Sequence, residues 1–86
     1  MRVLVPTPLR SYTANRAEVD GSGETMTKLL EDLDRSFPGI RFRMVDEQNR
    51  IRQHIRLFVN RERVSDLSHP LSSGDEVQIL CALSGG

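Results

Sequence analysis

Residues 74–86, Gly-Asp-Glu-Val-Gln-Ile-Leu-Cys-Ala-Leu-Ser-Gly-Gly, decide how the rest of this chain is interpreted. Apolar and polar residues alternate at the start of this stretch, which predicts a half-buried strand over 76–82. The strand leads directly into a flexible tail of small residues over about 82–86. Five extended residues span roughly 16 Å. The tail is therefore long enough to enter another protein's active site while the folded body stays outside.

The two terminal glycines, Gly85 and Gly86, are the candidate reactive residues. Glycine has no Cβ and adopts backbone conformations that other residues rarely adopt. A Gly-Gly end can therefore pass through a narrow channel and bring its carboxylate against a nucleotide phosphate. The alternative is a flexible end without function, and the strong strand just before it argues against that alternative.

Upstream, four further segments are predicted to be strands. The hydrophobic pattern places them at residues 1–6, 17–20, 55–60 and 62–64. Thr25 is a favourable N-cap for a helix that ends at Pro38-Gly39. Five apolar residues give this helix one buried stripe: Met26, Leu29, Leu30, Leu33 and Phe37.

The segment 40–53 fits no single pattern and is expected to form a short helical turn or an irregular excursion. The predicted order is strand, strand, helix, strand, short strand, strand. This order indicates an α+β domain spanning 1–86, in which a mixed sheet of four to five strands packs on one main helix.

Composition excludes several classes of protein. The chain has 86 residues, a formal net charge of zero and one cysteine. A domain this small has little room for an enclosed catalytic pocket. Zero net charge argues against a dedicated binder of nucleic acid or anionic membranes. His54 and His69 lack the spacing of metal ligands, and without a signal peptide or a long apolar run we expect a cytoplasmic protein.

Charge is unevenly distributed along the chain, because seven arginines fall between Arg41 and Arg63 while acidic residues gather earlier. Such a separation can indicate RNA binding. Aromatic residues among these arginines are few, and no RNA-recognition motif is present. A solvated or partner-facing basic surface is the favoured interpretation.

Strand alternation predicts that Phe58 and Leu80 point away from the helix-covered face of the sheet. Exposed apolar residues on neighbouring strands often mark a partner site. Leu4 is expected to extend this patch and Arg56 to lie at its rim. The alternative is ordinary apolar surface, which every protein has. Cys81 shares its alternation with Val77 and Ile79, so it is interpreted as a small core-facing residue and not as a reactive thiol.

Several segments of the chain match one pattern: Leu9-Arg10, Thr25 with Leu29-Leu30, Phe37-Pro38-Gly39, Phe58-Val59-Asn60, residues 71–77 and Leu83-Ser84-Gly85-Gly86. Together they resemble one family, the MoaD/ThiS sulfur carriers, which have the ubiquitin-like β-grasp fold. The resemblance covers essentially the whole chain, although proline is common where this sequence has Cys81. The length and the 40–53 excursion resemble the molybdopterin-synthase small subunit and its relatives in cysteine biosynthesis.

The resemblance implies that an E1-like adenylating enzyme joins the Gly86 carboxylate to AMP, using ATP and Mg²⁺. A sulfur donor then displaces AMP and leaves a thiocarboxylate, which is passed to a sulfur-accepting biosynthetic enzyme. Leu83 and Ser84 would contact the partner beside the tail. The chain itself would bind no cofactor or metal and would be a protein cosubstrate, not an enzyme, although it could be the small subunit of a synthase complex.

Two other classes of function stay open at this point. The chain could be a ubiquitin-like modifier conjugated to lysines through Gly86, or a non-catalytic β-grasp interaction module. The acceptor pathway is also open: cysteine or a sulfur-containing secondary metabolite is favoured and molybdopterin is possible. Some relatives need a metalloprotease to remove residues after the glycines, whereas here the reactive end is expected to be exposed already.

Overall fold

The predicted strand before the tail forms the centre of the sheet. The computed structural model describes residues 1–82 and contains one five-stranded sheet with the order β2-β1-β5-β3-β4. The central strand β5 runs parallel to β1 and antiparallel to β3, and the outer strands β2 and β4 complete two antiparallel hairpins. The strands are β1 (Arg2–Leu4), β2 (Glu18–Asp20), β3 (Ile55–Val59), β4 (Glu62–Val64) and β5 (Glu76–Cys81).

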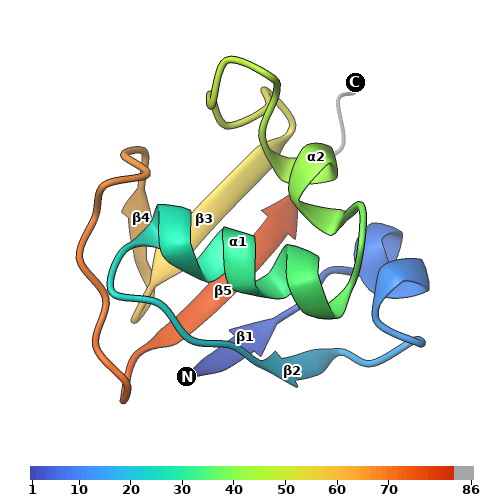
Figure 1. The fold of residues 1–86 in the computed structure, drawn as a ribbon, viewed down its shortest axis with the longest axis horizontal. Coiled ribbons are helices and arrows are strands. Elements are labelled where there is room, and N and C mark those ends of the chain that lie inside the picture. Colours follow the sequence, from blue (N-terminus) through green and yellow to red (C-terminus); the bar gives the residue numbers. More distant parts are fainter. Residues whose placement is uncertain (83–86) are drawn as a thin grey trace.

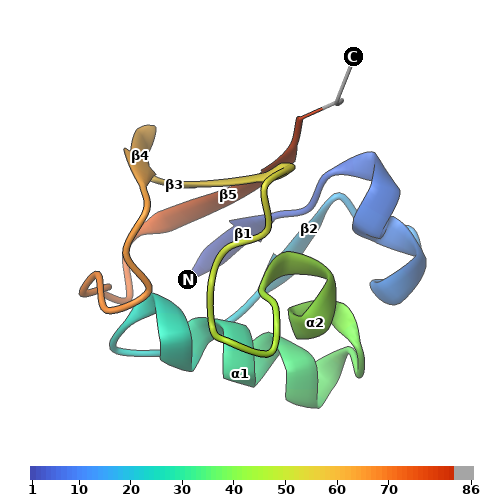
Figure 2. The ribbon, with the colours of Figure 1, turned by 90° about the horizontal axis from the view of Figure 1, so that it is seen from above.

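The main helix, α1 (Met26–Ser36), crosses one face of this sheet (Figure 1). It begins where expected, because the Thr25 hydroxyl oxygen accepts a hydrogen bond from the Lys28 backbone N–H at 3.3 Å. The predicted stripe is buried: Met26, Leu29, Leu30 and Leu33 are each at most 1% exposed. Both α-helices lie on the same side of the sheet (Figure 2).

The uncertain segment 40–53 begins as a second helix, α2 (Ile40–Met44). Ile40 and Met44 are fully buried, whereas Phe42 is 52% exposed, which is the spacing of a helix and not of a strand. The chain turns into α2 at Gly39, whose φ of 96° favours glycine. The Asp34 carboxylate holds the junction, accepting from the backbone N–H groups of Gly39 at 3.1 Å and Arg41 at 3.2 Å.

The connection after β1 forms a 3₁₀-helix, η1 (Thr7–Tyr12), against which α2 packs. The β3–β4 hairpin turns at Asn60 and Arg61, whose φ values of 51° and 74° are those of a type I′ turn. The predicted strands and the main helix are therefore all observed, and the two-layer α+β arrangement is the one that the sequence pattern indicates. No helix within residues 1–82 is long and apolar enough to cross a membrane.

Candidate functional site

The strand β5 carries the tail from the middle of the sheet. Its inward residues Val77 and Ile79 are at most 1% exposed. It is paired on both sides at Val77 and Gln78, and its pairing with β3 continues as far as Cys81, which lies opposite Ile55. Burial and two-sided pairing make this one of the most constrained segments of the chain.

Pairing continues one residue past the strand. The Ala82 backbone N–H donates to the His54 carbonyl oxygen at 2.7 Å, so the position where the tail leaves the body is fixed at the start of β3. The predicted reactive residues Gly85 and Gly86, and the predicted contact residues Leu83 and Ser84, lie outside the described residues. The structure describes the strand β5 and Ala82, which precede these residues in the chain.

The face of the sheet opposite the helices carries three of the predicted contact residues. Gln78 lies directly opposite Phe58 on one side and beside Leu4 on the other, and Leu80 is the next outward residue along β5. Leu80 is 38% exposed, and Leu4 and Phe58 are half-buried. We call Leu4, Phe58, Gln78 and Leu80 the outer-face cluster.

Polarity changes along this face. Towards the start of β5, the Arg2 guanidinium bridges Glu18 at 2.9 Å and Glu76 at 3.1 Å. Towards the end of β5 the outward residues are those of the outer-face cluster. The apolar part of the face therefore lies towards the end of β5, on the side where the described part of the chain ends at Ala82.

A small cavity of about 260 Å³ borders the outer-face cluster between β1 and β5. Leu4, Gln78 and Leu80 line it together with Arg10, which reaches back from η1. The Arg10 Nε donates to the Val5 carbonyl oxygen at 3.0 Å, which holds this side chain at the rim. The cluster is therefore hollowed on its β1 side.

Arg56 lies directly opposite Leu80, as predicted for a residue at the rim of the patch. Its guanidinium folds back towards the start of β3 and donates to the carbonyl oxygens of Gln53 at 2.5 Å and Ile55 at 3.1 Å. No carboxylate of residues 1–82 pairs with it.

Cys81 is half-buried and packs against the core, as its alternation with Val77 and Ile79 predicts. Burial raises the pKa of its thiol above the ordinary value. A raised pKa reduces the fraction of thiolate near neutral pH, and the thiolate is the nucleophile. The geometry thus gives Cys81 the properties of a packing residue.

Sequence reasoning missed one surface near the exit of the tail. Phe42 of α2, with Arg43, Arg52 and His54, lines a depression of about 330 Å³ beside the residue that bonds Ala82. The Arg52 guanidinium stands 4.6 Å from the centre of the Phe42 ring. Only the helical turn of α2 exposes Phe42, and the sequence left that turn uncertain.

The described residues offer no metal centre: within 1–82, no group of three or more His, Cys, Asp or Glu is placed to hold an ion. What the site presents is a constrained strand end beside an apolar cluster.

Comparison with known proteins agrees with this arrangement. A model described as the ThiS family matches residues 3–86. The sulfur carrier protein CysO of Mycobacterium tuberculosis is 33% identical over 89 residues, which cover 98% of this chain and 96% of the relative.

Two solved structures extend the comparison. A chain in the Amycolatopsis orientalis BexX/CysO complex has a TM-score of 0.91 at 32% identity, covering 99% of this chain and 98% of its own length. SAMP1 from Haloferax volcanii has a TM-score of 0.78 at 25% identity, covering 100% and 98%.

These similarities confirm the predicted β-grasp fold and the predicted class of protein, a sulfur carrier that serves as a substrate of enzymes. Because the family model spans almost the whole chain and the curated relative matches over nearly its full length, this chain belongs to the ThiS family.

Proposed function

We propose that this chain carries sulfur on the terminal carboxyl group of Gly86. An adenylating enzyme joins a carboxylate oxygen to the α-phosphorus of ATP and pyrophosphate leaves, with Mg²⁺ neutralising the phosphates. A sulfur nucleophile then attacks the carbonyl carbon and AMP leaves, which produces a thiocarboxylate. Membership of the ThiS family and similarity to CysO support this class of chemistry.

The observation that supports the proposal is that ordered pairing continues from the core to Ala82, the last residue that the structure describes. Ile79 in the centre of the sheet is 1% exposed, and the Ala82 N–H is still hydrogen-bonded to His54. The tail thus leaves a fixed point four residues before its end. A fully extended chain of four residues spans roughly 13 Å. A bare glycine carbonyl at that reach is accessible to an enzyme that accommodates only the tail.

Mass spectrometry of the protein purified with its adenylating enzyme, ATP and a sulfur donor tests the proposal. We expect a mass gain equal to the exchange of one oxygen for sulfur, located on the C-terminal peptide. Gly86→Ala should lose this gain and should slow ATP–pyrophosphate exchange, because the added Cβ crowds the attacked carbonyl. Full loading of Gly86→Ala would contradict the proposal.

We further propose that the adenylating enzyme docks on the outer-face cluster. Phe58→Asp should abolish adenylation, because it places a charge among Leu4, Gln78 and Leu80 at the interface. Circular dichroism should show that the variant stays folded, since Phe58 faces away from the core. Ser11→Asp, which adds the same charge on an exposed residue of η1, is the matched control and should be adenylated normally.

A second candidate function is conjugation to other proteins through the same Gly86 adenylate. The similarity to SAMP1, a protein named as a small archaeal modifier, favours keeping it. Isopeptide-linked adducts on lysines in the producing cell would establish this function. A thiocarboxylate without such adducts would support the carrier alone.

For the acceptor, we propose an enzyme of cysteine or sulfur-containing secondary-metabolite biosynthesis. The overall similarity to CysO supports this choice, as does the resemblance of Pro8-Leu9-Arg10 and the Leu-Ser-Gly-Gly ending to carriers of those branches. We place the protein in the cytoplasm, where ATP is available to the adenylating enzyme. Incubating the thiocarboxylate form with candidate acceptor enzymes and following sulfur transfer tests the acceptor directly.

A further inference from the structure

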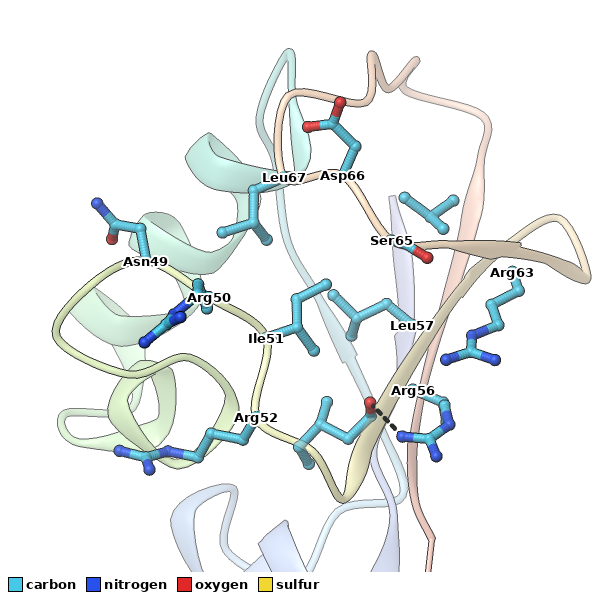
Figure 3. A pocket seen from close by; sticks show the side chains of 12 residues that line it. Asn49, Arg50, Ile51, Arg52, Arg56, Leu57, Arg63, Ser65, Asp66 and Leu67 are labelled. Carbon is cyan, nitrogen blue, oxygen red and sulfur yellow. Dashed lines mark hydrogen bonds between the residues drawn. The ribbon is translucent and has the colours of Figure 1, made fainter.

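A groove of about 520 Å³ opens beside the first half of β3. The short strand β4 reaches back along β3 only to Leu57, which pairs with Val64. The preceding residues of β3 therefore have no neighbouring strand on that side. Residues 49–52 form one wall of the groove and residues 65–67 form the other (Figure 3). The side chains of Ile51 and Leu57 lie between the two walls.

Four arginines from three separate segments line this groove: Arg50, Arg52, Arg56 and Arg63. We call it the arginine groove. Among them, only Arg50 has a carboxylate partner within residues 1–82, Asp46 at 3.7 Å. The Arg52 Nε donates to the Phe42 carbonyl oxygen at 2.7 Å, and the Arg56 guanidinium is likewise held by carbonyl oxygens. These bonds fix the side chains but leave their charges uncompensated.

Arg63 stands apart from the other three, because within residues 1–82 its exposed guanidinium makes no hydrogen bond or ion pair. Among residues 1–82, Asp66 is the one acidic residue that lines the groove. Its Oδ1 already accepts from the Ser68 N–H and hydroxyl, each at 2.8 Å, and these bonds hold the pKa of this carboxyl below its ordinary value. Asp46 pairs with Arg50, and Asp66 lies at the other wall of the groove, so the remaining guanidinium groups leave the groove with an excess of positive charge in a chain whose total is zero.

The arginine groove is continuous with the outer-face cluster. Arg63 on β4 lies directly opposite Phe58, and Arg56 lies directly opposite Leu80. A protein that covers Phe58 and Leu80 therefore also covers the edge of the groove. The other end of the groove reaches Arg52, which also borders the depression beside the exit of the tail.

We propose that the arginine groove receives an acidic segment of the adenylating enzyme, an inference that rests on the proposed function. Planar guanidinium groups pair with carboxylates through two parallel hydrogen bonds. The apolar floor at Ile51 and Leu57 packs against the carbon stems of such side chains. Because the groove is open to solvent, its charges act mainly on the rate of association and on its dependence on salt.

RNA is the competing occupant for a row of arginines. Binding of single strands relies on aromatic platforms for base stacking. Phe42 is the one large aromatic residue of 1–82 that is strongly exposed, and Arg52 already stands over its ring. The groove thus offers charge without a free stacking surface, which favours carboxylates of a protein.

The test measures association of the full chain with the purified adenylating enzyme by stopped-flow fluorescence at several salt concentrations. We expect Arg50→Glu combined with Arg63→Glu to slow association about tenfold at low salt and to flatten its salt dependence. Arg63→Glu alone should slow association by a smaller factor. Arg16→Glu is its matched control, because it makes the same change of charge at an exposed residue in the β2 hairpin, at the far edge of the sheet. It should associate like the parent.

A second measurement keeps the inference separate from the proposed function. At saturating enzyme the groove variants should still form the Gly86 adenylate, because they keep the tail, whereas Gly86→Ala should not form it. Unchanged association of the groove variants beside normal adenylation would overturn the groove proposal alone. Absence of adenylation in the parent would overturn the proposed function.

Two further outcomes would assign the groove elsewhere and overturn the proposal. Normal association with the adenylating enzyme but slowed sulfur transfer would assign the groove to the acceptor enzyme. The parent chain could also bind a fluorescent single-stranded RNA. If Arg63→Glu removed this binding and left enzyme association unchanged, the groove would be assigned to nucleic acid.

Photo-crosslinking from Ser65, which lines the groove, should capture a peptide rich in Asp and Glu from the adenylating enzyme.

Discussion

At the scale of single residues, two glycines differ in the space around them: one is closely surrounded by backbone atoms and the other is open. A Cβ built on Gly23, just before α1, would stand 2.4 Å from the Leu29 backbone nitrogen and 2.7 Å from the Lys28 carbonyl carbon. A Cβ on Gly74, in the turn before β5, would meet no atom within 4 Å. Backbone atoms cannot move aside as a side chain can, so only the first position requires glycine for its close approach.

We therefore expect Gly23→Ala to lower the free energy of unfolding by about 1–3 kcal/mol, the usual cost of forced overpacking. Gly74→Ala should leave stability unchanged or raise it by less than about 1 kcal/mol, since it only restricts the unfolded chain. Urea unfolding followed by circular dichroism measures both. Equal midpoints for the two variants would show that the segment before α1 relaxes freely.

At the scale of elements, the hairpin turn between β3 and β4 also locks the start of β5. The Asn60 side chain donates to Asp75 at 2.9 Å and accepts from the Glu76 N–H at 3.0 Å. The Asn60 backbone N–H donates to the Glu76 carbonyl oxygen at 2.8 Å. One residue in a left-handed conformation thus fixes the register of the strand that carries the tail.

Replacing Asn60 separates the contribution of its side-chain hydrogen bonds from that of its left-handed backbone conformation. Asn60→Gly keeps the positive φ but loses the side-chain bonds, whereas Asn60→Ala loses both, so alanine should be the less stable by about 1 kcal/mol. Thermal unfolding of the two variants beside the parent checks this order. If Asn60→Ala were as stable as Asn60→Gly, the turn would have adopted another conformation that does not need a positive φ at this residue.

The strands β3 and β5 and the helix α1 were predictable because each has a periodic pattern long enough to be recognised. The four buried residues of α1 recur over two full turns, and β5 alternates over five residues. The helix α2 was not predictable in the same way, since five residues hardly sample a helical period. Its conformation depends on Asp34, which belongs to the preceding helix.

The site was predictable only in part, for a related reason. Strand alternation placed Leu4, Phe58 and Leu80 on one face, because alternation is a local property. The arginine groove joins residues from three segments, so its existence depends on the register of β4 and on the path of residues 49–52. The sequence showed the richness in arginine but not the cavity that collects four of them.

At the scale of the whole molecule, several aspartates stabilise loops in their ionised form. Hydrogen bonds from Arg35 and from the Ser22 N–H lower the pKa of Asp32, and bonds from the Arg50 and Gln48 N–H groups lower that of Asp46. The Ser68 bonds lower the pKa of Asp66. The unfolded chain therefore binds more protons than the folded chain in acid, and stability rises with pH there.

We expect this contribution to be complete from about one pH unit above the ordinary aspartate value of 3.8, and to be lost as the pH falls through the lower pKa values of the folded state. Urea midpoints should therefore drop between about pH 5 and pH 2. Asp66→Asn should reduce this drop, because it removes one of the titrating groups. Glu47→Gln, at an exposed residue that makes no side-chain hydrogen bond within 1–82, serves as the control and should preserve the drop.

The parallel pairing of β1 with β5 has a mechanical consequence. If the first residue and the tail were pulled in opposite directions, the force would run along these two adjacent strands. The hydrogen bonds between them would then be loaded side by side and would have to break together, not one after another. This shear geometry opposes withdrawal of β5 from the sheet when the chain is pulled at the tail.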